Sequence, residues 1–181
     1  MGKILFKNIK AIVTCDDDDT IIRDCDMLVE EPRIVEIGFN LDDEGADVID
    51  CTNKVIYPGL INTHHHFFQT SVRNRMVIDY PSITVMEWLD RVFPIFANVD
   101  EEIMYYSSLT AMADLVKHGC TTGFDHQYTH TKGHGVYMID QQVKAAREIG
   151  MRYVGGRSAN TIPEDEGSPI PYEIHETTEE F

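Results

Sequence analysis

Residues 58–66 read Pro-Gly-Leu-Ile-Asn-Thr-His-His-His, and this stretch joins two parts of the sequence with different patterns. A Pro-Gly step is followed by a short apolar run and then by three histidines. Side chains alternate between the two faces of a strand, so His64 and His66 are expected to point one way and His65 the other. Two imidazoles on one face can bind one metal ion, and imidazole suits zinc or iron(II).

The part before this stretch has short strand-like segments separated by Asp, Gly, Pro and Asn residues. The segments cover residues 4–14, 27–31, 33–37 and 54–57. Their length and spacing predict a small antiparallel β module. The acidic run Asp16 to Asp19 lies between two of them and lacks the spaced ligands of a calcium loop, so it is interpreted as a solvated turn.

The part after this stretch alternates between strand and helix patterns. Asp100 is a good N-cap, and Lys117 to Gly119 form a stop signal, so a helix is predicted between them. Strands are predicted near residue 60 and over residues 120–126 and 151–157. The expected buried faces of the two helices are Tyr105, Leu109, Met112 and Val116, and Val136, Ile139, Val143 and Ala146.

This alternation predicts an α/β chain built from βα units around a parallel sheet. A closed (β/α)₈ barrel typically needs about 250 residues, so the residues after Tyr57 are too few to close one. In such barrels the active site lies at the carboxyl ends of the strands, which is where His64 and His66 fall. The sequence therefore predicts part of a barrel that carries part of a site.

Composition restricts the possible partners. The chain has 181 residues, with 31 acidic and 15 basic side chains and a formal charge of -16. This charge repels nucleic acid and anionic membranes, so neither is expected as a partner. There is no long apolar run and no signal-peptide pattern, which favours a cytoplasmic location. The four cysteines form no CxxC pair and are expected to be reduced and structural.

The sequence also resembles a known family. The pattern Pro58-Gly59-Leu60, followed by His64 and His66, is similar to the PGLxxxHxH first barrel strand of the amidohydrolase superfamily. The resemblance implies that residues 1–57 are the N-terminal part of a small β-sandwich and that residues 58–181 are the first βα units of a (β/α)₈ (TIM) barrel. It implies that His64 and His66 are ligands of one divalent metal ion, zinc or iron(II).

Within that superfamily the run from His64 to Asn74, HHHFFQTSVRN, resembles the guanine, 8-oxoguanine and hydroxytriazine aminohydrolases. The resemblance implies that Gln69 contacts the heterocycle, although a glutamine at a helix start is also commonly solvated. Trp88 either covers the ring of the substrate or belongs to the core. His126 either lines the pocket, supports a ligand or serves as a structural histidine.

Five other polar residues have weaker functional interpretations. His130 and His134 have metal-ligand spacing for a helix, but Gly133 and Gly135 interrupt one, so an exposed loop is expected. His118 is interpreted as a cation at a helix C-terminus and His175 as part of a polar tail. Arg157 could contact a substrate or form a structural ion pair.

The resemblance implies a metal-dependent deaminase of an aromatic nitrogen heterocycle such as 8-oxoguanine, guanine, a pterin or a hydroxytriazine, in which the metal activates water. The general acid/base and further ligands are expected beyond Phe181, so the chain would be an N-terminal fragment that is inactive alone. The alternatives are a non-catalytic subunit that needs a partner chain, and an amidohydrolase that displaces chloride or alkylamine or opens a cyclic amide. A homo-oligomer is plausible for the complete enzyme.

Overall fold

The computed structural model describes residues 2–134, 137–162 and 166–181. The chain divides into two compact units, Met1–Pro58 and Gly59–Phe181. The division therefore falls at the Pro58-Gly59 step, where the sequence pattern changes. No helix among the described residues is long and apolar enough to cross a membrane.

The first unit is a single mixed sheet. Its strands are β1 (Lys3–Val13), β2 (Ile21–Glu30), β3 (Arg33–Gly38), β4 (Ala46–Asp50) and β5 (Val55–Ile56). The order is β3-β2-β1-β4, and β5 also pairs with β1. The expected antiparallel pairing holds for β1–β2 and β2–β3, but β4 and β5 pair parallel to β1. The fully antiparallel prediction was wrong because β4 was not predicted and because the last predicted strand, β5, pairs parallel to β1.

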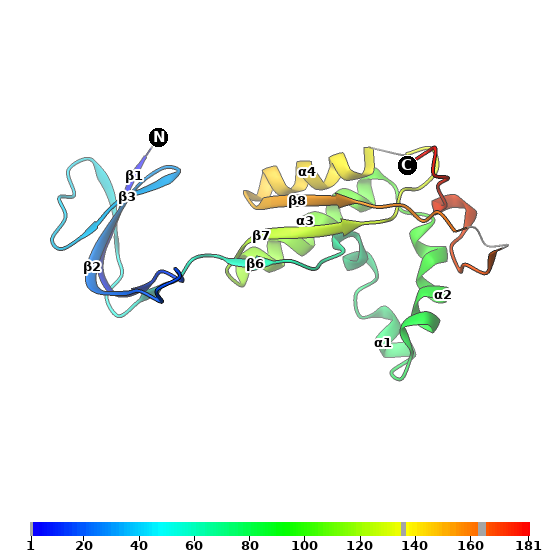
Figure 1. Ribbon diagram of the computed structural model, residues 1–181, viewed down its shortest axis with the longest axis horizontal. Helices are drawn as coiled ribbons and strands as arrows, with labels where there is room; N and C mark the ends of the chain where they lie inside the picture. The colour runs from blue at the N-terminus through cyan, green and yellow to red at the C-terminus, as the bar shows by residue number, and fades with distance from the viewer. Residues whose placement is uncertain (1, 135–136, 163–165) are drawn as a thin grey trace. The chain divides into compact units, whose positions relative to one another are not determined.

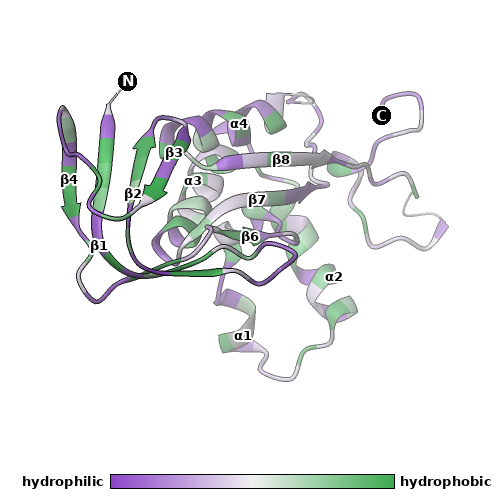
Figure 2. Ribbon diagram, turned by 60° about the vertical axis from the view of Figure 1, so that its left-hand side comes forward, coloured by the Kyte–Doolittle hydropathy of each residue, from purple (hydrophilic) through white to green (hydrophobic). Residues whose placement is uncertain are grey.

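Apolar residues of this sheet form its own core. Figure 2 shows hydrophobic and hydrophilic residues interspersed along these strands. The buried members of the core are Ile9, Ile12, Cys25, Met27 and Cys51. All four cysteines of the chain are free thiols, but Cys15 is exposed, so the prediction that every cysteine is structural was wrong for this one.

The second unit is built around a parallel sheet of three strands. The strands β6 (Leu60–Asn62), β7 (Cys120–Gln127) and β8 (Arg152–Arg157) lie side by side in that order (Figure 1). The helix α3 (Glu101–Lys117) precedes β7, and α4 (Tyr137–Ile149) precedes β8. Each helix packs against the strand that follows it, and the two helices pack against each other. The prediction of βα units around a parallel sheet is confirmed.

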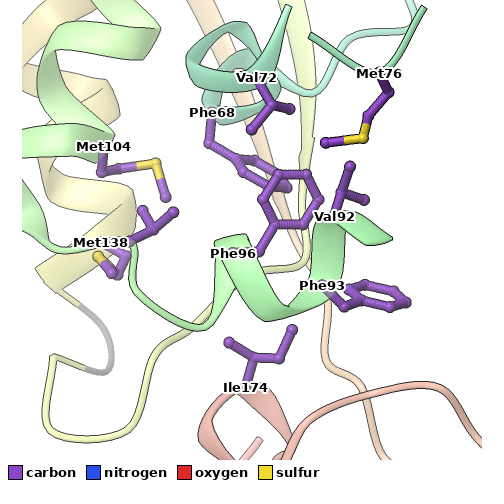
Figure 3. Packing of buried hydrophobic residues seen from close by; sticks show 10 residues of the cluster. Phe68, Val72, Met76, Val92, Phe93, Phe96, Met104, Met138 and Ile174 are labelled. Carbon is purple, nitrogen blue, oxygen red and sulfur yellow. The ribbon is translucent and has the colours of Figure 1, made fainter. Parts of the chain in front are cut away.

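A long helical connection runs from β6 to α3. It contains the 3-10 helix η1 (Phe67–Val72), α1 (Arg75–Asp79) and α2 (Val85–Phe96). Helix α2 begins with a capping box, in which the Thr84 hydroxyl accepts the Glu87 N–H and the Glu87 carboxylate accepts the Thr84 N–H. Figure 3 shows the cluster that packs this connection, with the rings of Phe68 and Phe96 edge to face at 4.8 Å. The connection is therefore a packed part of the unit.

The C-terminal segment contributes to the same cluster. The 3-10 helix η3 (Tyr172–Ile174) places Ile174 fully inside the core (Figure 3). The expectation of a polar tail was wrong for this residue, because two isoleucines, Ile170 and Ile174, in a segment rich in Pro and Glu are too few to give a periodic signal.

The two ends of α3 lie where the sequence predicted them, but the face of the helix that is buried differs from the predicted one. The Asp100 carboxylate accepts a hydrogen bond from the Ile103 N–H at 2.8 Å, and Gly119 follows the helix with φ +83°. Of the four residues expected on the buried face only Met112 is fully buried, and Val116 is 39% exposed. The face that is buried consists of Met104, Ser107, Ser108, Ala111 and Met112. Small residues allow the close approach of α4, so packing, not apolar periodicity, selects this face.

The buried face of α4 differs from the prediction in a similar way. Ala146 is buried as expected, whereas Ile139 and Val143 are only half-buried, and Val136 lies outside the described residues. The fully buried positions are Met138, Gln142, Ala145 and Ala146. A buried glutamine gives no apolar signal, so this face could not be assigned from hydropathy alone.

Candidate metal and substrate site

The three histidines lie between the end of β6 and the start of η1. The rings of His64 and His66 pack edge to face with their centroids 5.3 Å apart. The ring of His65 instead lies against Phe67, at 4.5 Å between centroids. His65 thus points away from the pair formed by its two neighbours, His64 and His66. The three rings therefore alternate as the sequence predicted, although they follow the end of β6 at Asn62.

A backbone contact fixes the protonation of His66. Its Nδ1 lies 2.7 Å from the carbonyl oxygen of His126. A carbonyl oxygen only accepts hydrogen bonds, so Nδ1 carries the proton and Nε2 keeps a lone pair. Burial is the main cause that lowers the pKa of His66, which favours the neutral ring. A neutral imidazole with a free Nε2 lone pair is the form that binds a divalent metal.

His126 supports this arrangement mainly through its backbone. Its N–H donates to the carbonyl of His65 at 2.9 Å, and its own carbonyl accepts from the His66 ring. Its exposed ring lies 5.5 Å from the ring of His66, and its Nε2 contacts the Ser158 hydroxyl at 2.8 Å. His126 therefore supports the candidate ligand His66 through its backbone carbonyl, which holds the His66 ring in place.

Gln69 has a partner that the sequence did not indicate. Its Nε2 donates to the hydroxyl oxygen of Tyr128 at 2.6 Å. Burial raises the pKa of Tyr128 to about 12, so the phenol is neutral at physiological pH. The Tyr128 ring also packs edge-on against His66 at 5.1 Å. Tyr128 directly follows the end of β7, and no local pattern pairs it with Gln69, which lies 59 residues earlier in the sequence.

A pocket of about 390 Å³ brings several of the predicted residues together. His64, His66, Gln69 and Trp88 all line it, whereas the His126 side chain does not. Trp88 also packs against the core cluster, with its ring 6.2 Å from Phe96. Trp88 is therefore both a lining residue and a partly buried core residue, and the two interpretations of it are compatible.

The residues present fit part of a metal site. His64 and His66 supply two imidazoles on one side of the strand end, as zinc or iron(II) requires. Among the described residues there is no group of three or more His, Cys, Asp or Glu side chains placed to hold a metal ion. The described chain thus offers two ligands, and a closed coordination shell needs additional donors.

The second histidine pair differs from its prediction. His130 is only 2% exposed, so the expectation of an exposed loop was wrong for it. Its segment is drawn inward because the Thr131 hydroxyl donates to the Val99 carbonyl at 2.7 Å and the Lys132 N–H donates to the Glu173 carbonyl at 2.8 Å. His134 is half-buried and contacts Glu101 at 2.8 Å.

The remaining polar candidates have structural contacts. His118 lies exposed at the end of α3, with Nδ1 2.7 Å from the Asp114 carbonyl oxygen, as expected for a helix C-terminus. His175 contacts the Thr161 carbonyl oxygen at 3.3 Å. Arg157 pairs with Glu176 at 2.5 Å, which is the structural ion pair that was one of its two interpretations.

A parallel βα sheet with a histidine pair beyond the carboxyl end of its first strand is the arrangement expected for the first units of a (β/α)₈ barrel enzyme, whose active site lies at that end of the strands. Residues 55–181 match the model of the Amidohydrolase family. The chain belongs to this family.

Two relatives and one solved structure illustrate the similarity. Hydroxydechloroatrazine ethylaminohydrolase of Pseudomonas sp. (strain ADP) is 40% identical over 100% of this chain and 40% of its own length. 8-Oxoguanine deaminase of Pseudomonas aeruginosa is 32% identical over 99% of this chain and 39% of its own length. Atrazine chlorohydrolase of Arthrobacter aurescens TC1, solved with zinc, has a TM-score of 0.82 and 23% identity over 98% of this chain and 40% of that one. The chain spans about two fifths of the length of the curated relatives it matches.

Proposed function

We propose that the protein containing this chain is a metal-dependent hydrolytic deaminase of an aromatic nitrogen heterocycle, such as a hydroxytriazine, 8-oxoguanine, guanine or a pterin. The observation that carries the proposal is the His64–His66 pair. The His126 carbonyl accepts the hydrogen bond from Nδ1 of His66, so Nε2 of His66 keeps a lone pair that can bind a metal. Similarity to an ethylaminohydrolase and an 8-oxoguanine deaminase supports the choice of reaction and substrate class.

In this proposal His64 and His66 hold a single divalent ion, zinc or iron(II). When bound there, the ion would lower the pKa of a water molecule and so supply a nucleophile near neutral pH. Similarity in fold to a zinc-containing chlorohydrolase supports zinc over iron. The reaction also needs a group that moves protons to the leaving amine, and we assign none among the described residues.

Gln69 and Trp88 are proposed to bind the heterocycle. One amide N–H of Gln69 is used by Tyr128, which leaves the carbonyl oxygen and the second N–H for the donors and acceptors at the edge of a ring. The indole of Trp88 lines the same pocket and offers an apolar surface for the ring face. The net charge of -16 supports a small-molecule substrate rather than a nucleic acid, and we propose a cytoplasmic enzyme.

A second candidate is displacement of an alkylamine or chloride from a triazine. The relative at 40% identity is named for releasing ethylamine, and the solved structure for acting on a chlorinated triazine. The two candidates use the same activated water and differ in the leaving group. They are therefore distinguished by the product and not by the site described above.

The test is a product assay on the complete natural protein loaded with zinc. We expect ammonia from 8-oxoguanine, guanine, pterin or an aminohydroxytriazine, and no product from His66→Ala. The assay also includes an ethylaminotriazine and a chlorotriazine, and release of ethylamine or chloride from these with no ammonia from the first set of substrates would replace the first candidate by the second. Bound zinc without any product would favour the non-catalytic subunit and contradict both reactions.

A further inference from the structure

The buried side chain of Asp125 connects to the histidine segment. Asp125 lies on β7 and is fully buried. One carboxylate oxygen accepts the backbone N–H of Phe67 at 2.6 Å, and the other accepts the Gln142 amide at 2.6 Å. The Gln142 carbonyl oxygen in turn accepts the Tyr153 hydroxyl at 2.8 Å. A chain of hydrogen bonds thus runs from β8 through α4 and β7 to the first residue of η1.

Phe67 is the residue directly after His66, and its N–H needs a partner. The first N–H groups of a helix have no acceptor within the helix itself. His66 is the N-cap of η1, and its side chain makes no capping hydrogen bond. The Asp125 carboxylate therefore caps η1 from a neighbouring strand, in a position where negative charge is also favoured by the helix dipole.

Three contacts in a row fasten the histidine segment to β7. The His126 N–H donates to the His65 carbonyl, and the His66 ring donates to the His126 carbonyl. The third contact is that of Asp125 with Phe67, and it alone depends on a side chain of β7. Substitution can remove this contact while leaving the two backbone contacts in place.

We propose that Asp125 is a positioning residue for the metal ligands, because it fixes the backbone immediately after His66 and thereby the direction of the His64–His66 pair. The inference rests on the proposed metal-binding function of that pair. Groups that orient metal ligands from behind typically change metal affinity by about 10- to 100-fold when removed. A purely structural role for Asp125 would change stability without changing the affinity of the folded protein for zinc.

The test measures zinc affinity by competition with a chromophoric chelator in the complete natural protein. We expect Asp125→Ala to lower the affinity at least 10-fold. Asp125→Asn should restore it, because its amide oxygen can still accept the Phe67 N–H and its amide group can donate to a reoriented Gln142. Tyr153→Phe is the matched control, since it breaks the far end of the same chain and should keep wild-type affinity.

A double variant, Asp125→Leu with Gln142→Leu, covers the case in which Asp125→Ala does not fold. It replaces two buried polar groups by apolar ones, and so removes the cap, its Gln142 partner and the acceptor of the Tyr153 hydroxyl. We expect the same loss of zinc affinity in the folded double variant. Wild-type affinity in any folded variant that lacks the Asp125 carboxylate and amide would overturn the inference. Absence of zinc binding by the wild-type protein would instead overturn the proposed function on which the inference rests.

Discussion

The first turns of η1 and α3 each have a backbone N–H bonded to a carboxylate, but the two carboxylates come from different parts of the chain. Helix α3 is capped by its own neighbour in the sequence, since Asp100 accepts the Ile103 N–H at 2.8 Å. Helix η1 is capped across the fold, since Asp125 of β7 accepts the Phe67 N–H at 2.6 Å. The first cap is partly exposed, and the second is completely buried.

This difference separates a cap that shapes one helix from a cap that joins two elements. A local cap stabilises its own first turn and has little effect elsewhere. A cap from a neighbouring strand also fixes the position of the segment that it holds. The segment held in this way contains the candidate metal ligands, so the buried carboxylate is expected to affect both stability and the site.

The largest expected effect concerns the pH dependence of the buried cap. Burial raises the pKa of Asp125 from 3.8 to about 6. The folded state therefore binds this proton more tightly than the unfolded state does. The contribution of this group to the free energy of unfolding is complete below about pH 4 and is lost as the pH rises through about 6. At about 1.4 kcal/mol per pKa unit, the free energy of unfolding falls by about 3 kcal/mol over this range.

Asp125→Asn has no such proton to lose. Between pH 4 and pH 7 its free energy of unfolding is expected to rise relative to wild type by an amount of that order, as measured by urea unfolding at each pH. Asp17→Asn, in the exposed acidic turn, controls for the change in net charge. A constant difference between wild type and Asp125→Asn across this range would show that the carboxylate is not held as the structure describes.

A smaller effect is expected at the local cap. Asp100→Ala should lower the free energy of unfolding by about 1 kcal/mol, since the Ile103 N–H loses its acceptor. Asp100→Asn should restore most of this stability, because asparagine caps a helix about as well as aspartate. Zinc affinity should be the same in both variants. A loss of zinc affinity in folded Asp100→Ala would remove the distinction between the two caps.

The same two caps explain how far the sequence could predict the structure. Asp100 was predicted because its signal is local: a capping residue directly before two glutamates and a helical pattern. The βα order and the His64–His66 geometry were predicted for the same reason, since strand alternation acts over neighbouring residues. Asp125 was missed because its partner, Phe67, lies 58 residues away in the sequence.

The missed features of the site have the same origin. The hydrogen bond between Gln69 and Tyr128 joins residues that are 59 positions apart in the sequence, and no local pattern near either residue predicts it. The burial of His130 depends on contacts of its neighbours Thr131 and Lys132 with distant segments. In the first unit the parallel pairing of β4 with β1 is likewise a long-range choice. Local patterns identified the elements, and tertiary contacts decided which polar groups are buried.

The central claim is that His64 and His66 bind a metal ion together. The direct test is the zinc content of the purified complete protein, measured by mass spectrometry, for wild type, His64→Ala with His66→Ala, and His134→Ala. We expect about one zinc per wild-type or His134→Ala molecule and none in the double variant, because imidazoles at the strand end supply the ligands. Zinc retained at wild-type stoichiometry in the folded double variant would contradict the claim.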